Sequence, residues 1–247
     1  MVLFIYYCLI AYDGFERNEK MKKIAVAIDG PAAAGKSTVA KIVARKLKYM
    51  YIDTGAMYRA VTLYVLNNGV NVENEQVISE LLPKISIKFT HKEDGQHVLL
   101  NGVDVTDEIR SDSVTNNVSV VSSHSTVRQE MVGRQQKFVA ERGVVMDGRD
   151  IGTHVIPDAE IKFFLIASVD ERAARRFTEN ERRGFKTDID QIKKEIRERD
   201  LQDMQRDVSP LVKADDAIEL DTTSYTIQEV AEKMLHQIYE VIESLQK

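Results

Sequence analysis

Cysteine, proline and histidine are scarce in this chain of 247 residues. The single cysteine, Cys8, excludes an intramolecular disulfide and a metal site built from several cysteines, which favours a reducing compartment and therefore the cytoplasm. With only four prolines, no segment in the middle of the chain is typical of a disordered linker, so one large domain is expected. The five histidines are scattered without the spacing of metal ligands and are interpreted as surface or core residues.

The chain also lacks a net positive charge. The formal net charge of −5 argues against a protein that binds nucleic acid through bulk electrostatics, because polyanions are held by basic surfaces. Any anionic ligand must therefore be met by local clusters of basic residues. We expect a monomer whose partners are small molecules, with neither nucleic acid nor membranes among them.

Residues 30–37 read GPAAAGKS and fit the phosphate-binding P-loop pattern GxxxxGK[ST]. The preceding segment IAVAID, residues 24–29, is long enough for a strand but too short for a helix. The following segment, STVAKIVARKLK, has the apolar periodicity of a helix. The motif therefore lies in the order of strand, loop and helix that it requires, and a glycine-rich turn without a ligand is the alternative.

The residue types of this motif have a chemical reason. Gly30 and Gly35 carry no Cβ, so the backbone can wrap around a phosphate chain at the positive N-terminus of the following helix. Lys36 neutralises the β and γ oxygens of a nucleoside triphosphate, while the Ser37 hydroxyl reaches Mg²⁺. The motif predicts an ATP site whose Mg²⁺ is held through Ser37 and water molecules.

The first twenty residues, MVLFIYYCLIAYDGFERNEK, differ from the rest of the chain. Their apolar run ends by Tyr12, which is too short to span a bilayer, and it has neither a basic region before it nor a clear cleavage site after it. Met21 followed by KKIAVAID is typical of the start of a P-loop kinase. Our hypothesis is that residues 1–20 are an extension from a misplaced start codon and that 21–247 form the domain, and a membrane or partner anchor is the alternative.

Strand-like and helical segments alternate along the chain, which is typical of a parallel sheet covered by helices on both faces. Buried strands are predicted within residues 24–29, 50–52, 143–150, 161–168 and 217–220. Between 84 and 106 the apolar period changes to two, and turn residues occur at EDG and at Asn101-Gly102. A small antiparallel insert is therefore expected within an α/β fold.

Polar residues follow two of these strands, at the edge where open α/β sheets bind their ligands. DTGAMYR places Thr54 where it can cap a helix, with Arg59 further inside that helix. DGRD ends a strand with Asp147, Arg149 and Asp150; such an Asp can serve Mg²⁺ and such an Arg can clamp a phosphate. A capped helix with a surface arginine, and a surface salt bridge, are the alternatives.

Residues 171–186, ERAARRFTENERRGFK, carry six cations against three anions in an otherwise acidic chain. Five of these cations are arginines, whose planar forks suit a transferring phosphate, so a mobile lid is expected here and a plain charged helix is the alternative. Further along, Arg199, Asp203 and Arg206 share one face if their segment is helical. An ion-paired helix stripe is the alternative interpretation of these three residues.

Taken together, GPAAAGKS, DTGAMYRA, the β insert, DGRDIGT, the arginine-rich segment and ERDLQDMQR closely resemble the bacterial cytidylate kinase family over residues 22–245. IDGPAAAGKST, DTGAMYR and DGRDIGT are the most specific pieces, because a P-loop alone fits many functions. The resemblance implies a P-loop NTPase fold, with a five-stranded parallel sheet flanked by helices. It also implies an antiparallel insert at about 80–110 in the monophosphate-binding part, a short lid at about 171–186 and in-line phosphoryl transfer from ATP to CMP or dCMP.

The same resemblance implies the residues that hold the substrates. ATP is assigned to Gly30, Pro31, Ala32, Ala33, Ala34, Gly35, Lys36, Ser37 and Thr38. The CMP phosphate is assigned to Thr54, Arg59 and Arg149, cytosine to Ser119, Arg128 and Asp150, and ribose to Arg199 and Asp203 with Arg206 nearby. The expected catalytic residues are Lys36, Arg149, Asp150, Arg175 and Arg182. Cytosine has a donor at N4 and acceptors at N3 and O2, which a pocket of Asp, Arg and Ser can match.

Two other functions are compatible with the P-loop. A P-loop kinase for another nucleotide or a small metabolite would have no reason for the ERDLQDMQR segment. A regulatory or nucleic-acid-dependent P-loop protein is opposed by the acidic net charge and by the absence of a guanine-reading NKxD motif from the sequence. ADP release measured with a panel of nucleoside monophosphates, and without any acceptor, separates the three possibilities.

Overall fold

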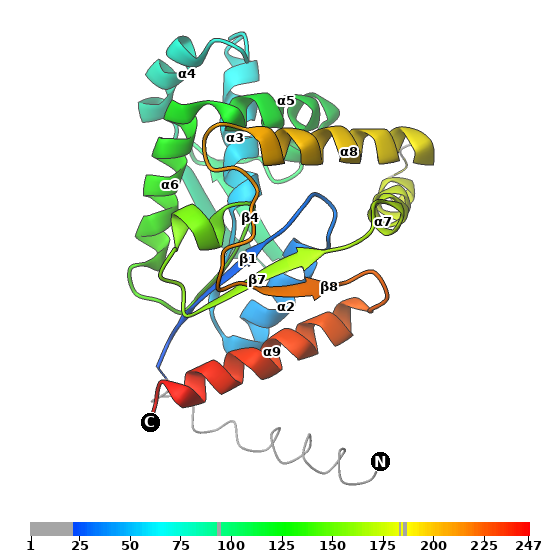
Figure 1. The fold of residues 1–247 in the computed structure, drawn as a ribbon. Helices are drawn as coiled ribbons and strands as arrows, with labels where there is room; N and C mark the ends of the chain where they lie inside the picture. The colour runs from blue at the N-terminus through cyan, green and yellow to red at the C-terminus, as the bar shows by residue number, and fades with distance from the viewer. Residues whose placement is uncertain (1–21, 93–94, 183, 185–186) are drawn as a thin grey trace.

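The computed structural model describes residues 22–92, 95–182, 184 and 187–247 (Figure 1). The expected extension, residues 1–20, lies outside the described residues. Of the expected lid, residues 183, 185 and 186 also lie outside them. The turn predicted at EDG is described only at Gly95.

A five-stranded parallel sheet forms the centre of the molecule, in the order β2-β6-β1-β7-β8. Its strands are β1 (Ala25–Asp29), β2 (Met50–Asp53), β6 (Val144–Asp147), β7 (Ile161–Ile166) and β8 (Ile218–Asp221). Every residue of the central strand β1 is buried, as its apolar sequence AVAID requires when both faces of the sheet are covered. The prediction of a parallel sheet flanked by helices is confirmed.

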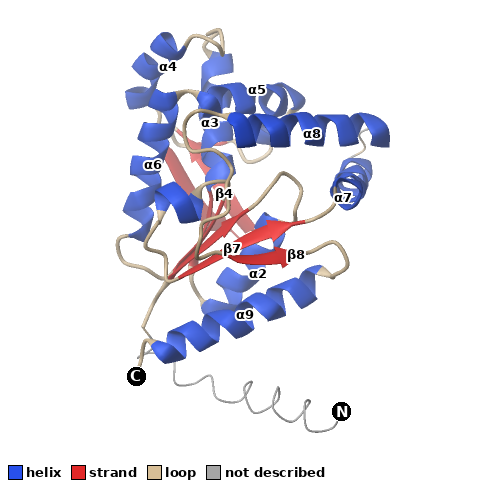
Figure 2. Cartoon of the chain, in the orientation of Figure 1, coloured by secondary structure: helices blue, strands red, loops and turns tan. Residues whose placement is uncertain are grey.

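Helices cover both faces of this sheet, which Figure 2 shows in red between blue helices. On one face, α2 (Lys36–Leu47) packs against α9 (Ile227–Ser244). The other face is covered by α3 (Thr54–Asn67), α5 (Asp112–Ser123) and α6 (Ser125–Val139), with the short α4 (Glu75–Leu81) beside α6. Because side chains alternate along a strand, β1 contributes to both of the resulting cores.

The expected insert is a three-stranded antiparallel sheet in the order β3-β4-β5, which confirms the prediction. Its strands are β3 (Ile87–Lys92), β4 (Gly95–Leu100) and β5 (Val103–Asp104). Asn101 and Gly102 link β4 to β5 with φ angles of 50° and 87°. Both residues of such a tight hairpin turn need a positive φ, which Asn and Gly adopt most readily. Short 3₁₀ turns flank the insert at Leu82–Lys84 and Glu108–Arg110.

Two further helices, α7 (Val169–Arg182) and α8 (Ile189–Gln205), pack against each other (Figure 1). Ala173 of α7 and Ile192 and Ile196 of α8 form a small apolar cluster that also contacts Ala33 of the P-loop. Between β6 and β7, a short π-helical turn η4 (Ile151–Val155) directly follows Asp150. Helix α7, which holds residues 171–182 of the arginine-rich segment, thus packs with α8 against the loop that follows β1.

Candidate active site

The P-loop between β1 and α2 has a backbone that ordinary side chains would not permit. Gly30 has a φ of 142°, and a Cβ added there would lie 2.1 Å from the carbonyl oxygen of Leu165. Gly35, with a φ of 87°, directly precedes the first residue of α2. Since glycine offers no side chain to cap the helix, the N–H groups of its first turn are left to bind an anion. Ala33 also has a positive φ, 59°, so the loop curls over its whole length.

Lys36 begins α2 and is only 5% exposed. Its Nζ donates to the carbonyl oxygen of Pro31 across 2.7 Å, so the ammonium lies within the curl of the loop. Burial lowers the pKa of Lys36 well below its usual range, and the charge of Arg149 acts in the same direction. A phosphate in this loop would supply the negative charge that favours the ammonium form.

Asp147, the last residue of β6, joins the P-loop to strand β2. Its Oδ2 accepts from the Ser37 hydroxyl at 2.7 Å, and its Oδ1 accepts from the Tyr51 hydroxyl at 2.8 Å. Burial raises the pKa of Asp147 to about 6, and the charge of Asp53 acts in the same direction. Burial and the Asp147 charge also raise the pKa of Tyr51 well above its usual value, so the phenol remains a hydrogen-bond donor.

This pair of oxygen ligands fits Mg²⁺. Mg²⁺ prefers oxygen and keeps several water molecules, so a protein site for it commonly supplies one or two groups and leaves the rest to water and phosphate. The Ser37 hydroxyl and the Asp147 carboxylate are such groups, and they already lie 2.7 Å apart. Within the described ranges, no cluster of three or more His, Cys, Asp or Glu residues suited to a metal ion is found.

Thr54 lies beside Asp147 but does not cap α3, so that prediction is wrong. The cap is Asp53, whose Oδ1 accepts from the N–H of Ala56 at 2.9 Å. Thr54 is already inside the helix, and its buried hydroxyl donates to the carbonyl oxygen of Asp147 at 2.7 Å. A Cβ on Gly148 would lie 2.6 Å from that hydroxyl oxygen, so glycine at this position permits the close approach of β6 and α3.

Four arginines from separate elements form a positively charged cluster: Arg59, Arg149, Arg176 and Arg199. Burial lowers the pKa of Arg59 to about 9, and the charges of Arg199 and Arg176 contribute to the shift. Burial and the charge of Arg149 lower the pKa of Arg199 to about 10. The Nε of Arg199 is buried without a hydrogen-bond partner among the described residues. Such a cluster favours an anion, because guanidinium groups stay charged at neutral pH.

Asp203 of α8 balances part of this charge. Arg149 Nε donates to its Oδ2 at 2.8 Å, and Arg206 NH1 lies 3.7 Å from its Oδ1. Burial alone would raise the pKa of Asp203, but the charges of Arg149 and Arg199 hold it below its usual value. Arg199 and Asp203 both belong to α8, and Arg206, the C-cap residue of this helix, lies against the same carboxylate at i,i+3 spacing. The helix ends at Gln205, and Arg206 has extended backbone angles of −65° and 142°.

A second ion-paired group, formed by Arg128 and Asp150, adjoins the pair of Arg149 and Asp203 through Arg206. Arg128 is 2% exposed, donates to Oδ2 of Asp150 and to the carbonyl oxygen of Ser122, and stacks 5.2 Å from the centre of the Tyr58 ring. Arg206 lies 3.8 Å from the other oxygen of Asp150. Ser119 is half-buried in α5, and within the described part of the chain its hydroxyl bonds to neither Arg128 nor Asp150. The structure therefore joins Arg128, Asp150 and Arg206 directly, but not Ser119.

Asp29, at the end of β1, fixes the turn that carries Asp150. Its two carboxylate oxygens accept from the N–H groups of Ile151 and Gly152 at 2.8 and 2.7 Å. Burial raises the pKa of Asp29 to about 6. Sequence reasoning did not single this residue out, although a carboxylate ending an apolar strand just before a P-loop is a signal of such a role.

The arginines of α7 differ in their surroundings. Arg175 donates to the hydroxyl and carbonyl oxygens of Thr222, and a Cβ on Gly35 would lie 3.6 Å from its NH1. Arg172, which sequence reasoning included only as part of the basic segment, is 5% exposed and donates to the P-loop carbonyl of Ala32 at 3.1 Å. Its NH1 also donates to Asp200 of α8 at 2.6 Å. Arg182 is exposed at the end of α7.

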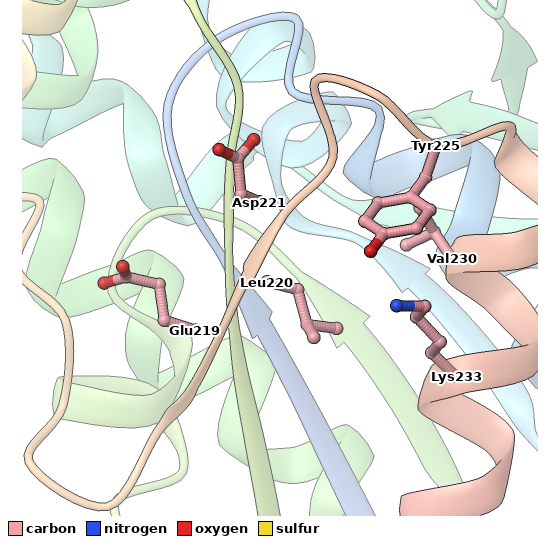
Figure 3. Close-up of a pocket in the computed structure, with 6 residues that line it drawn as sticks. All are labelled: Glu219, Leu220, Asp221, Tyr225, Val230 and Lys233. Atoms are coloured by element: carbon pink, nitrogen blue, oxygen red, sulfur yellow. The ribbon is translucent and has the colours of Figure 1, made fainter.

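The pocket shown in Figure 3 lies beside the edge strand β8, next to Thr222, whose hydroxyl donates to the P-loop carbonyl of Ala34 at 3.4 Å. It has a volume of about 240 Å³ and is lined by Glu219, Leu220, Asp221, Tyr225, Val230 and Lys233. None of these six residues belongs to the P-loop or to the arginine cluster. A search of the described residues for a helix of sufficient length and apolar character to cross a membrane found none.

A family model and curated relatives match most of this chain. A family model described as cytidylate kinase matches residues 26–240. A cytidylate kinase from Bacillus pumilus is 62% identical over 214 residues, which cover 87% of this chain and 95% of that protein. A cytidylate kinase from Bacillus cytotoxicus is 56% identical over 222 residues, which cover 90% of this chain and 99% of that protein. A solved gluconokinase from Sinorhizobium meliloti 1021 has a TM-score of 0.48 and 13% identity, covering 92% of this chain and 98% of that chain.

Proposed function

The chain belongs to the cytidylate kinase family, and on this premise we propose that it transfers the γ-phosphate of ATP to CMP and dCMP. The observation that carries the proposal is the arginine cluster of Arg59, Arg149, Arg176 and Arg199, which lies next to a P-loop. One anion site would hold the triphosphate of ATP, and the other would hold the phosphate of the acceptor. A kinase for a different nucleotide is not favoured by the family match.

ATP binds along the P-loop, residues 30–38, in this proposal. The curled backbone and the first turn of α2 present N–H groups to the phosphates. The ammonium of Lys36 contacts the β- and γ-phosphate oxygens and neutralises their charge during transfer. Arg175 closes the loop from the side of α7. Arg182, at the exposed end of the same helix, is proposed to join the lid contacts when both nucleotides are bound.

The acceptor binds between α3, η4 and α8. Thr54, Arg59 and Arg149 are proposed to receive its phosphate. Thr54 and Arg59 belong to α3, which directly follows β2, and Arg149 lies two residues after the end of β6. Asp150 and Arg128 offer an acceptor and donors to the cytosine ring, with Ser119 proposed as a further contact from α5. Arg199 and Asp203 are proposed to hold the ribose hydroxyls, with Arg206 as the support of both carboxylates.

Phosphoryl transfer needs alignment and charge neutralisation, since the protein contributes little covalent chemistry. Ser37 and Asp147 are the residues proposed to hold Mg²⁺, which neutralises charge on the β- and γ-phosphates when bound. Lys36 and the arginines oppose the negative charge that spreads over the equatorial oxygens. No side chain has to form a covalent bond to the phosphate, so the acceptor oxygen attacks directly.

The decisive experiment measures ADP release with CMP, dCMP, UMP and AMP as acceptors, and with no acceptor. We expect release that depends on CMP or dCMP and that is strongest with these two nucleotides. Release that needs none of the four acceptors, or that responds only to AMP, contradicts the proposed function. A monomeric state, a cytoplasmic location and the absence of nucleic acid among the partners belong to the same proposal, and gel filtration tests the first of them.

A further inference from the structure

Tyr51 of β2 is held at three points. Its hydroxyl donates to Oδ1 of Asp147 at 2.8 Å, and its backbone oxygen accepts from Nε2 of Gln96, on the small sheet, at 2.6 Å. The ammonium of Lys41 lies 5.7 Å from the centre of its ring, within the range of a cation–π contact. The side chain is only 4% exposed. Burial and these contacts hold the ring where its hydroxyl meets Asp147.

The approach of this phenol to Asp147 comes from outside the P-loop. Tyr51 lines a groove of about 770 Å³ between α2 and the small sheet, together with Lys41, Tyr49 and Gln96. Ser37 approaches the same carboxylate from the P-loop, through Oδ2. The two hydroxyls thus hold the two oxygens of one carboxylate from opposite elements, β2 and α2.

Two donors on separate oxygens determine how a carboxylate is rotated. With only the Ser37 contact, the Asp147 group could turn about its Cβ–Cγ bond and still accept one hydrogen bond. The bond from Tyr51 leaves one orientation, in which Oδ2 faces the Ser37 hydroxyl. Because Asp147 is 4% exposed, water is not available to take the place of this donor freely.

We propose that Tyr51 is a positioning residue for the binding of Mg²⁺ together with ATP, because it orients the Asp147 carboxylate toward Ser37. Tyr51 touches neither substrate nor phosphate in this proposal. It acts through Asp147, and its hydroxyl also interacts with the Ser37 hydroxyl on the same carboxylate. The inference rests on the proposed kinase function, from which it takes ATP and Mg²⁺ as the ligands of the P-loop. It adds a residue that neither the P-loop pattern nor the DGRD segment contains.

The test is Tyr51→Phe, which keeps the ring and its contact with Lys41 and removes only the hydroxyl. The matched control is Tyr49→Phe. Tyr49 lines the same groove, but its hydroxyl accepts from the N–H of Ile24 at 3.2 Å, and among the described residues it makes no hydrogen bond to Asp147. Both variants are compared with the full-length parent for the thermal midpoint without ligand, so that any loss of folding is seen directly.

ATP binding is then measured by calorimetry without CMP, once with Mg²⁺ and once with EDTA. The affinity that the parent gains from Mg²⁺ should be reduced about 3- to 10-fold in Tyr51→Phe, the loss expected for one hydrogen bond, and unchanged in Tyr49→Phe. Binding in EDTA should match the parent in both variants. In turnover, the half-saturating Mg²⁺ concentration should rise while KM for CMP stays the same.

An equal gain from Mg²⁺ in Tyr51→Phe and the parent overturns the positioning role. Equal losses with Mg²⁺ and with EDTA overturn it too, because they indicate a structural contribution of the hydroxyl. The binding measurement contains no acceptor nucleotide, so it remains informative if CMP is not the substrate. A parent enzyme that releases no ADP with CMP would contradict the proposed function and leave the Mg²⁺ readout of Tyr51 intact.

Discussion

The guanidinium of Arg149 and the carboxylate of Asp203 are joined by a hydrogen bond of 2.8 Å, although 54 residues separate them in the chain. The bond connects the end of the central sheet to α8. Arg149 belongs to the arginine cluster at the proposed phosphate site, and Asp203 is the proposed ribose contact. The pair therefore couples the position of α8 to the groups that are proposed to bind the acceptor.

Removing the carboxylate of Asp203 should weaken the binding of CMP and leave the binding of ATP unchanged. Asp203→Ala is expected to raise KM for CMP by about 10-fold or more, because an arginine left unpaired in a buried site is unfavourable and shifts its neighbours. KM for ATP should stay near that of the parent. Steady-state kinetics with each substrate varied in turn measure both values, with Asp203→Asn as the matched control of equal size. A defect confined to ATP would show that this helix does not serve the acceptor.

Lys36→Ala should abolish most of the turnover, on the order of 10²-fold or more, because the ammonium stabilises charge that develops on the β and γ oxygens. The fold should be retained, since within the described residues the Lys36 side chain makes a single hydrogen bond, the one to Pro31. Turnover and the circular dichroism spectrum are measured on the same preparation. Near-normal turnover would contradict the assignment of this loop to ATP.

The lid arginines are tested one at a time as Arg→Lys variants at positions 175, 176, 182 and 183. At least one of them should lower kcat by about 10-fold or more, because a lysine cannot supply the planar fork. We expect the largest effect at Arg176, whose charge acts on both Arg59 and Arg199. If all four variants match the parent in kcat, these arginines do not contact the transferring phosphate.

The choice of base is tested at Asp150. Its carboxylate can accept from the exocyclic amine of cytosine, which uracil replaces by an oxygen. Asp150→Asn should therefore reduce discrimination between CMP and UMP, since an amide also donates, and an unpaired polar group costs roughly 1–3 kcal/mol. The measured quantity is the ratio of kcat/KM for the two nucleotides. An unchanged ratio would remove Asp150 from the cytosine site.

The buried carboxyl of Asp29 predicts how the stability of the fold depends on pH. Burial raises its pKa to about 6 from the ordinary value of 3.8. Between these two values the folded protein binds more protons than the unfolded one, so this group lowers the free energy of unfolding as the pH rises through that window. In Asp29→Asn the pH dependence from this group is absent. The difference in thermal midpoint between variant and parent should therefore shift in favour of the variant from pH 4 to pH 7.

Thermal denaturation at several pH values between those limits measures this difference. A pKa raised from 3.8 to about 6 changes the free energy of unfolding by about 3 kcal/mol across this window, which is large enough to be seen in the thermal midpoint. The variant also loses one of the two acceptors for Ile151 and Gly152, and that loss lowers stability at every pH. Only the slope with pH is therefore diagnostic, and a constant difference would show that the carboxyl titrates normally.

Local patterns in the sequence were sufficient for the architecture. The parallel strands were recognisable because each is a short apolar run between helical segments, and the antiparallel insert because its apolar period changes to two. Glycine at 30 and 35 marked the phosphate loop, since the required backbone depends on the residue itself. Helix ends were less predictable: Asp53 caps α3 in place of Thr54, and α8 ends before Arg206. Neighbouring polar residues can each serve as a cap, and only the tertiary contacts choose between them.

By itself, the sequence determined the fold class, the family and the segments that carry the chemistry, because these depend on residues close together in the chain. Only the tertiary structure decided which polar groups meet. Tyr51 reaches Asp147 across 96 residues because β2 pairs with β6, and Asp29 reaches Gly152 across 123 residues because η4 packs on β1. Strand order and burial decide such contacts, and neither is written in the spacing of residues along the chain.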